Sequence, residues 1–205
     1  MTIICLEGPS YGGKTTAIGH LRTTPELADR AVFLGCYVRH LRRTHPIPPA
    51  RTCSASEQFT AFETFMTAET DRVAQATENP GRLVILDRSV DTLMAHAYAM
   101  DQLYGFRVHA QVRRRLEELP HLRPDHTIYL DVSAETLRRR RRTEAGSLAE
   151  SEYFLHDAAF LAQARAYFLD KPQPPITRQI TVLPADAPPG HIAKTVQDLV
   201  EAWSR

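Results

Sequence analysis

The chain lacks the features of a secreted, membrane-bound or metal-stabilised protein. It has three cysteines, and Cys5, Cys36 and Cys53 form neither a C-x-x-C pair nor a metal-ligand spacing. Since Cys5 and Cys36 stand in apolar stretches, we expect buried thiols in a reducing compartment. The N-terminus has no basic region before its apolar residues, so it does not resemble a signal peptide. We therefore expect a cytoplasmic protein that does not bind membranes.

An excess of charge of either sign is also missing. Lys+Arg is 25 and Asp+Glu is 24 among 205 residues, which gives a net charge of +1. This balance gives no reason to expect nucleic-acid binding, so any basic site must be local. Lysine occurs only at Lys14, Lys171 and Lys194, and the other basic residues are arginines.

Five short apolar segments alternate with helical patterns along the chain. This alternation predicts an α/β fold with a mostly parallel sheet covered on both faces, in one domain spanning 1–205. The expected strands are 2–8, 31–38, 82–88, 126–132 and 179–185. A helix is expected over 57–77, after a capping box from Ser54 to Glu57. The clearest helix is the last one, in which apolar residues recur from Ile192 to Trp203 at helical spacing.

A phosphate-binding loop follows the first expected strand. Gly8, four further residues, and then Gly13, Lys14 and Thr15 match G-x-x-x-x-G-K-[ST], and a helix pattern follows. In such a loop the main-chain N–H groups point at phosphate oxygens, the lysine neutralises the β- and γ-phosphates and the Thr15 hydroxyl holds Mg²⁺. The residues expected to bind the nucleotide are Gly8, Ser10, Tyr11, Gly12, Gly13, Lys14, Thr15 and Thr16.

The scarcity of asparagine decides between the classes of protein that use this loop. A GTPase normally reads guanine with an Asn-Lys-x-Asp segment, yet the chain has a single asparagine, Asn79, in the sequence ENPG. Large motor-type ATPases need a bigger core and further motifs. Small-molecule kinases are the class that remains.

A second motif stands at the end of the third expected strand. Asp87 and Arg88 follow a buried apolar run, at the edge where doubly wound sheets bind their ligands. Beside a phosphate loop, such an aspartate can hold Mg²⁺ through water or accept a proton, and the arginine can bridge two phosphates. The alternative is a surface ion pair that ends the strand.

With these motifs in order, the chain resembles the thymidylate kinase family and, more broadly, nucleoside monophosphate and deoxynucleoside kinases. The likeness is carried by LEGPSYGGKTT (6–16), the pair Asp71-Arg72, LDRS (86–89), RPDHTIYLDVSAETLRRRRR (123–142) and ARAYF (164–168). The resemblance implies ATP- and Mg²⁺-dependent phosphoryl transfer on a three-layer P-loop kinase fold, with a five-stranded parallel sheet and a basic lid over about 138–152. Since family members are commonly dimers, it also leaves a homodimer open.

The same resemblance assigns roles to individual residues. Lys14 and Thr15 would serve ATP and Mg²⁺, Asp87 and Arg88 would serve the acceptor, and Arg72 would face the acceptor's base. The arginine run would begin the lid. Because successive helical residues rotate by about 100°, not all five arginines can face one site, and we expect Arg139 and Arg142 to be catalytic. Arg138, Arg140 and Arg141 are expected in solvent, and a nucleic-acid-binding run is the alternative.

Several positions depart from the family pattern on the acceptor side. Ser10 replaces an aspartate of the loop, Leu93 a polar residue, and His96 a tyrosine. Where related kinases carry an acid after the second strand, the chain has basic residues, which suits an acceptor that is already a phosphate. The expected acceptor-binding residues are Arg39, Arg72, Arg88 and His96, and Thr15 and Asp87 are the expected metal ligands. Two alternatives stay open: a hydroxyl kinase with Asp87 as base, and a nucleotide-binding regulator without catalysis.

Overall fold

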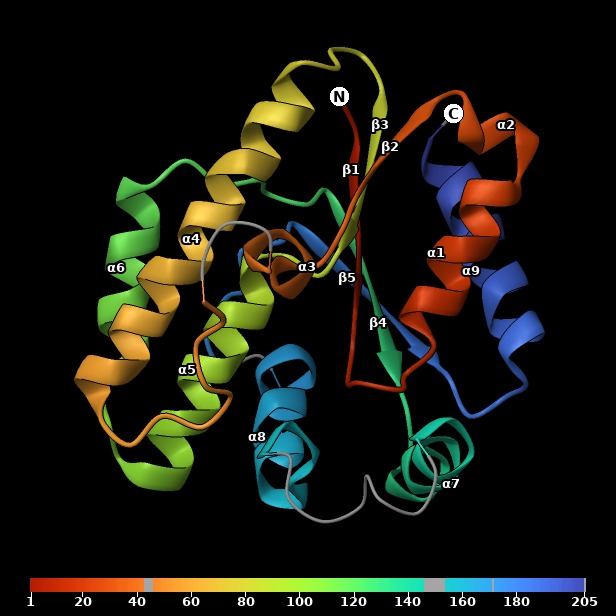
Figure 1. Ribbon diagram of the computed structural model, residues 1–205. Coiled ribbons are helices and arrows are strands. Elements are labelled where there is room, and N and C mark those ends of the chain that lie inside the picture. The colour runs from red at the N-terminus through yellow and green to blue at the C-terminus, as the bar shows by residue number, and fades with distance from the viewer. Residues whose placement is uncertain (43–45, 146–153, 171, 205) are drawn as a thin grey trace.

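The protein is built around a five-stranded, all-parallel sheet in strand order β2-β3-β1-β4-β5 (Figure 1). The computed structural model describes residues 1–42, 46–145, 154–170 and 172–204. The strands are β1 (Ile3–Glu7), β2 (Ala31–Leu34), β3 (Leu83–Asp87), β4 (His126–Asp131) and β5 (Gln179–Pro184). The predicted α/β class and the five predicted strands are confirmed.

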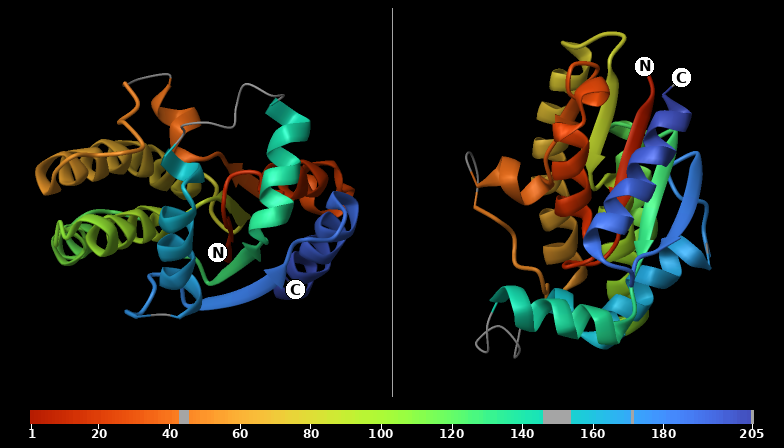
Figure 2. Two further views of the ribbon diagram at one scale, coloured as in Figure 1. Left: turned by 90° about the horizontal axis from the view of Figure 1, so that it is seen from below. Right: turned by 90° about the vertical axis from the view of Figure 1, so that its right-hand side faces the viewer.

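Helices cover both faces of this sheet, which explains why the central strands β1 and β3 are buried along their whole length. Figures 1 and 2 show the two helical layers on opposite sides of the sheet. One layer contains α1 (Lys14–Thr23), α2 (Pro25–Ala28) and α9 (Pro189–Trp203). The other contains α4 (Ala55–Thr77), α5 (Val90–Tyr104), α6 (His109–Glu118) and α8 (Ala158–Leu169), with the short α3 (Tyr37–Leu41) beside it.

One helix lies beyond the carboxyl ends of the strands. This helix, α7 (Ala134–Ala145), follows β4 and carries the arginine run (Figure 2). A 3-10 turn, η2 (Phe154–His156), leads into α8. The predicted lid over 138–152 therefore begins in α7, and its part after residue 145 lies outside the described residues.

The second strand is shorter than the sequence predicts. We expected a strand over 31–38, but β2 ends at Leu34 and Tyr37 begins α3. A continuous apolar run does not distinguish a strand from a buried helix. Tyr37 is held in the helix layer because its hydroxyl donates a hydrogen bond to Glu69 and its ring lies against Arg72.

Two local predictions about helices are confirmed. The Ser54 hydroxyl accepts a hydrogen bond from the Glu57 N–H, and the Glu57 carboxylate accepts one from the Cys53 N–H, so the capping box starts α4 at Ala55. In α9, Ile192 and the apolar residues one and two turns later face the core. Within the described residues, no helix combines the length and the apolar character needed to cross a membrane.

Candidate active site

The loop between β1 and α1 has a backbone that only glycine accepts at key positions. Gly8 and Gly13 have φ angles of 131° and 98°. A Cβ atom on Gly8 would lie 2.7 Å from the main-chain oxygen of Leu130, and one on Gly12 would lie 2.9 Å from that of Pro9. The loop therefore lies close to neighbouring backbone, and it can follow this path only because glycine has no side chain. This is the tight main-chain cradle that a polyphosphate requires.

Lys14 begins α1 with its side chain folded under this loop. Its ammonium donates hydrogen bonds of 2.8 Å to the main-chain oxygens of both Gly8 and Pro9. Burial, followed by the nearby positive charge of Arg88, lowers the pKa of Lys14 to about 7, although Asp87 and Glu7 oppose this shift. An ammonium with so low a pKa gains strongly from a bound anion.

A cavity of about 1210 Å³ opens at the carboxyl ends of the strands, between the loop and the α3, α4, α5 and α8 layer. Most of the predicted site residues meet there. The predicted residues that line it are Gly8, Ser10, Tyr11, Gly12, Gly13, Lys14, Thr15, Thr16, Arg39, Asp87, Arg88 and His96. Three predicted residues, Arg72, Arg139 and Arg142, do not line this cavity.

Asp87 and Arg88 stand side by side at the end of β3, next to the end of β1. The Arg88 N–H donates a hydrogen bond to the Leu6 carbonyl, which continues the pairing of the two strands. Arg88 has a φ of 70°, in the left-handed region that side chains other than glycine rarely adopt. This turn ends the strand, and both Asp87 and Arg88 line the cavity.

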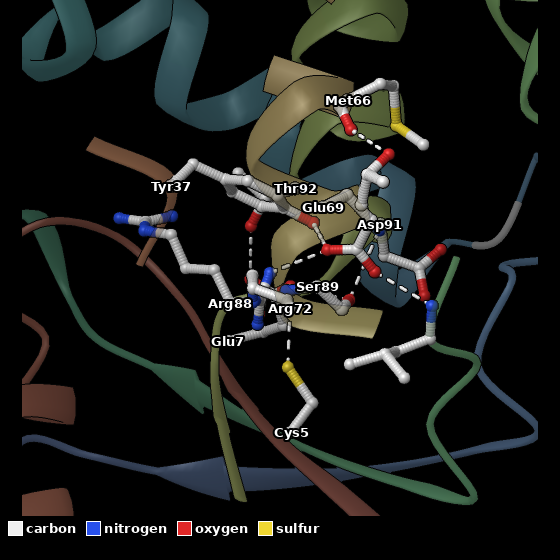
Figure 3. Close-up of polar contacts among 12 residues, drawn as sticks. Cys5, Glu7, Tyr37, Met66, Glu69, Arg72, Arg88, Ser89, Asp91 and Thr92 are labelled. Atoms are coloured by element: carbon white, nitrogen blue, oxygen red, sulfur yellow. Dashed lines mark hydrogen bonds and ion pairs between the residues drawn. The ribbon is translucent and has the colours of Figure 1, made fainter. Parts of the chain in front are cut away.

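Glu7 organises the start of α5, and our sequence-based prediction missed it. Its buried carboxylate accepts hydrogen bonds from the Ser89 N–H at 2.8 Å, the Ser89 hydroxyl at 2.9 Å and the Thr92 hydroxyl at 2.6 Å (Figure 3). Burial raises the pKa of Glu7, while the Arg88 charge and these hydrogen bonds act in the opposite direction. A glutamate placed directly before the loop glycine was the available signal, because acids are rarely buried without a partner.

Arg72 occupies a different place from the one predicted. Its side chain is completely buried outside the cavity, where the guanidinium pairs with Glu69 at 3.0 Å and lies 4.6 Å from the centre of the Tyr37 ring. A second guanidinium nitrogen donates to the main-chain oxygen of Arg88 at 2.7 Å (Figure 3). Arg72 therefore supports Arg88 from behind and does not face a molecule in the cavity.

The arginines of α7 divide between two hollows. Arg138 and Arg141 line the large cavity, whereas Arg139 and Arg140 line a side pocket of about 240 Å³. Arg140 also donates hydrogen bonds to the main-chain oxygens of Tyr11, Ala185 and Ala187. Arg142 is exposed and lines neither hollow. The catalytic roles of Arg139 and Arg142 stay predictions, and the geometry adds Arg138 and Arg141 as candidates.

Two further charged groups lie at the cavity wall. Arg165 of α8 forms two hydrogen bonds of 2.8 Å with the carboxylate of Asp131, at the end of β4. Both residues line the cavity, and our sequence-based prediction did not name them as site residues. Arg165 stands inside the quoted segment ARAYF, but the segment does not indicate which way its side chain points.

Two oxygen-bearing side chains at the cavity, Thr15 and Asp87, could contribute to a magnesium ion held mainly by the phosphates of a nucleotide. Within the described part of the chain there is no group of three His, Cys, Asp or Glu side chains that could hold a metal ion. Thr15 is exposed at the cavity wall, and Asp87 lines the same cavity. Few protein ligands are typical of Mg²⁺ that is bound largely through phosphates and water.

Comparisons with known proteins agree with this arrangement. No model of a known protein family matches the sequence, and no curated protein matches it. Among solved structures, the thymidylate kinase from Candida albicans is similar to 98% of this chain, over 91% of its own, with a TM-score of 0.68 and 18% identity. The deoxyadenosine kinase from M. mycoides, solved with dCMP and dCDP bound, is similar over 98% of this chain and 100% of its own, with a TM-score of 0.63 and 14% identity. The chain therefore has the P-loop kinase fold of thymidylate and deoxynucleoside kinases.

Proposed function

We propose that this chain is a kinase that transfers the γ-phosphoryl group of ATP to a nucleoside monophosphate or a nucleotide-like acceptor. The observation that carries this proposal is the position of Lys14. Its buried ammonium lies under a glycine loop at one side of a large cavity, and Asp87 and Arg88 line the same cavity. The fold shared with a thymidylate kinase and a deoxyadenosine kinase supports phosphoryl transfer as the reaction.

On the donor side, the loop amides and Lys14 would hold the phosphates of ATP. The side pocket adjoins the loop through Tyr11, Gly13 and Thr16 and has Arg139 on its wall, so it suits the donor's base. Arg140 fixes both the loop and the segment after β5, because it donates to carbonyl groups of each. Thr15 and Asp87 would hold Mg²⁺, which when bound neutralises charge on the transferring phosphates.

On the acceptor side, an oxygen of the acceptor attacks the γ-phosphorus. The bond from that phosphorus to the β,γ-bridging oxygen breaks, and ADP leaves with the electron pair. Lys14, Arg88 and two arginines of α7, Arg138 and Arg141, line the cavity in which this charge develops, so they would stabilise it. Arg39, exposed at the cavity wall, would contact an acceptor phosphate.

One observation favours a second candidate function, a kinase acting on a hydroxyl group. Asp87 is a buried carboxylate at the cavity wall beside Arg88, which is a suitable place for a base that accepts a hydroxyl proton. The two kinase reactions differ in their acceptors, and a regulator that only binds nucleotide would use none. A screen for ADP release with nucleosides and their monophosphates in parallel separates all three.

The Lys14→Ala variant tests the proposal itself. We expect acceptor-dependent ADP release to disappear while the circular dichroism spectrum stays that of the parent, because the lost ammonium binds phosphate. Lys194→Ala is the matched control, since Lys194 is exposed on α9 and pairs with Asp198 outside the cavity. Unchanged phosphoryl transfer in Lys14→Ala would refute the assignment. Near-normal rates in both Arg88→Ala and Arg139→Ala would show that we have assigned the catalytic site to the wrong residues.

A further inference from the structure

One part of the cavity wall is apolar, in contrast to the polar wall formed by the phosphate loop. We call it the acceptor lobe and define it by Phe62 and Phe65 of α4, Leu93 of α5, and Phe160 and Phe168 of α8, all of which line the cavity. These helices lie together on one side of the sheet (Figure 1). Three of the rings belong to the buried core, so the wall is pre-formed and does not depend on mobile side chains.

Two polar side chains beside these rings already have partners within the protein. The Tyr37 hydroxyl donates its hydrogen to the Glu69 carboxylate at 3.0 Å. The Gln58 side-chain oxygen accepts a hydrogen bond from the Thr52 hydroxyl at 2.8 Å. Gln58 keeps its two amide N–H donors, but its oxygen and the tyrosine hydroxyl are already engaged.

His96 is engaged in the same way. Its Nε2 lies 2.9 Å from the main-chain oxygen of Ala50 and can only donate to it. Its other ring nitrogen is buried without a hydrogen-bond partner among the described residues, and the ring centre lies 5.1 Å from that of Phe160. Burial lowers the pKa of His96, which favours the neutral form of the ring. His96 therefore adds an aromatic surface to the lobe. It offers few polar groups that could recognise a ligand.

This supply of polar groups is poor for a nucleobase. The edge of a base carries several donors and acceptors, and each one buried without a partner costs about 1–3 kcal/mol. The same cavity also has charged side chains at its wall, among them Lys14, Arg39, Asp87 and Arg88. The cavity thus matches a molecule that is charged or hydroxylated at one end and apolar at the other.

We propose that, of the two kinds of acceptor named in the proposed function, the cavity prefers the nucleotide-like one: a compound that has an apolar fused-ring body in place of a nucleobase and carries one phosphate or hydroxyl group. This inference rests on the proposed function, because that function determines which group of the acceptor reacts. The preference of the lobe for an apolar ring is a property of binding alone. It can therefore be tested separately from catalysis.

The first experiment compares binding of two probes to the full chain. 1-Naphthyl phosphate and thymidine 5′-monophosphate are titrated by calorimetry in the presence of Mg²⁺ and saturating AMP-PNP, so that the phosphate loop is occupied. We expect 1-naphthyl phosphate to bind at least about tenfold more tightly, which is the discrimination that one or two apolar groups provide in a fitted pocket. Equal or tighter binding of thymidine 5′-monophosphate, or of the adenosine, cytidine or guanosine monophosphate, would overturn the inference.

A parallel arm identifies the reacting end. ADP release is measured with 1-naphthol and with 1-naphthyl phosphate: turnover of the first supports a hydroxyl acceptor, and turnover of the second a phosphate acceptor. If AMP-PNP itself does not bind, the proposed function fails. If AMP-PNP binds but the naphthyl probes show no advantage over nucleotides, only the inference about the lobe fails.

Substitution of Leu93 locates the probe. Leu93→Gln places an amide among the rings, and we expect it to weaken 1-naphthyl phosphate binding about tenfold without changing AMP-PNP affinity. Leu93→Met, which keeps the volume apolar, should bind the probe like the parent. If Leu93→Gln does not fold, Phe65→Gln, at a half-buried position, replaces it. Unchanged probe affinity in a folded glutamine variant would contradict the proposed location.

Discussion

The guanidinium of Arg72 holds the main-chain oxygen of Arg88 at 2.7 Å, from a position that has no access to the cavity. Arg88 has a φ of 70°, a backbone conformation that costs a residue with a side chain of order 1–3 kcal/mol. The same guanidinium pairs with Glu69, which also accepts hydrogen bonds from the Tyr37 hydroxyl and the Leu122 N–H. A buried ion pair thus fixes the turn that presents Arg88 to the cavity.

Replacing Arg72 with lysine should separate this positioning role from catalysis. A lysine ammonium can stay near Glu69 but lacks the planar fork that reaches the Arg88 carbonyl at the same time. We expect kcat to fall by about 10- to 100-fold with a smaller change in acceptor KM, because small displacements of a catalytic group have effects of that size. Steady-state kinetics with an acceptor from the ADP-release screen measure both constants.

Arg82→Lys is the matched control for this experiment. Arg82 also donates to main-chain oxygens, those of Asp29 and Ala31, but it does not line the cavity. Both variants should lose about 1–2 kcal/mol in urea unfolding from the weakened hydrogen bonds. The role of Arg72 would be only structural if both variants lost stability and neither lost turnover.

The first glycine of the phosphate loop offers a test of the cradle. Gly8→Ala forces a Cβ to within 2.7 Å of the Leu130 oxygen at a φ of 131°. We expect a loss of more than about 2 kcal/mol in unfolding free energy and a loss of ADP binding, because the loop must move. Gly19→Ala on α1 is the control: nothing lies within 4 Å of its added Cβ, and the helix should gain about 1 kcal/mol. Normal ADP affinity in Gly8→Ala would show that the loop does not bind phosphates in this form.

Nucleotide binding should take up a proton at alkaline pH. The pKa of Lys14 is lowered to about 7 in the protein, so at pH 8 this amine is mostly neutral. Bound phosphates favour the charged form and raise the pKa, so binding of Mg·ADP at pH 8 should take up about 0.9 proton, and at pH 6 about 0.1. Calorimetry in buffers of different ionisation enthalpy measures this number.

Lys14→Arg is the control for proton uptake, because a guanidinium stays charged across this range. Any protons exchanged by the ligand itself appear in both proteins and cancel in the difference. An equal number of protons taken up by the parent and by Lys14→Arg at pH 8 would show that Lys14 does not titrate on binding.

Much of the fold could be predicted because local sequence patterns determine it. Buried parallel strands need unbroken apolar segments, and the phosphate loop needs its glycines at fixed spacing, so both are visible without tertiary information. The end of β2 could not be predicted in this way. The apolar residues continue through Tyr37, and its place in a helix is decided by contacts with Glu69 and Arg72, which are distant in sequence.

The candidate site likewise has residues that a local motif fixes and residues whose role depends on distant contacts. Lys14, Asp87 and Arg88 were predicted because each stands at the end of a strand or in a motif whose geometry is fixed. The place of Arg72 could not be predicted, since the motif fixes its position on α4 but not the direction of its side chain. Glu7 was missed because its function depends on Ser89 and Thr92 reaching it from the start of α5.

The last prediction concerns the arginine run on α7 and which of its side chains face the large cavity. Arg138 and Arg141 are three residues apart and line the large cavity, while Arg139 lies on the side pocket and Arg142 on neither. The Nε of Arg141 is buried without a hydrogen-bond partner in the described structure, and burial lowers its pKa. A phosphate in the cavity would supply that partner.

We therefore expect Arg141→Ala to reduce kcat by about 10³-fold, the effect of removing an arginine from a transferring phosphoryl group. Arg142→Ala, one residue further along the same helix, should reduce it less than tenfold. Because these side chains are wholly or partly exposed, both variants should unfold within about 0.5 kcal/mol of the parent, so a lower rate reflects chemistry and not unfolding. The opposite order of rates would favour Arg139 and Arg142, the pair chosen from the sequence, and would mean that α7 rotates when the substrates bind.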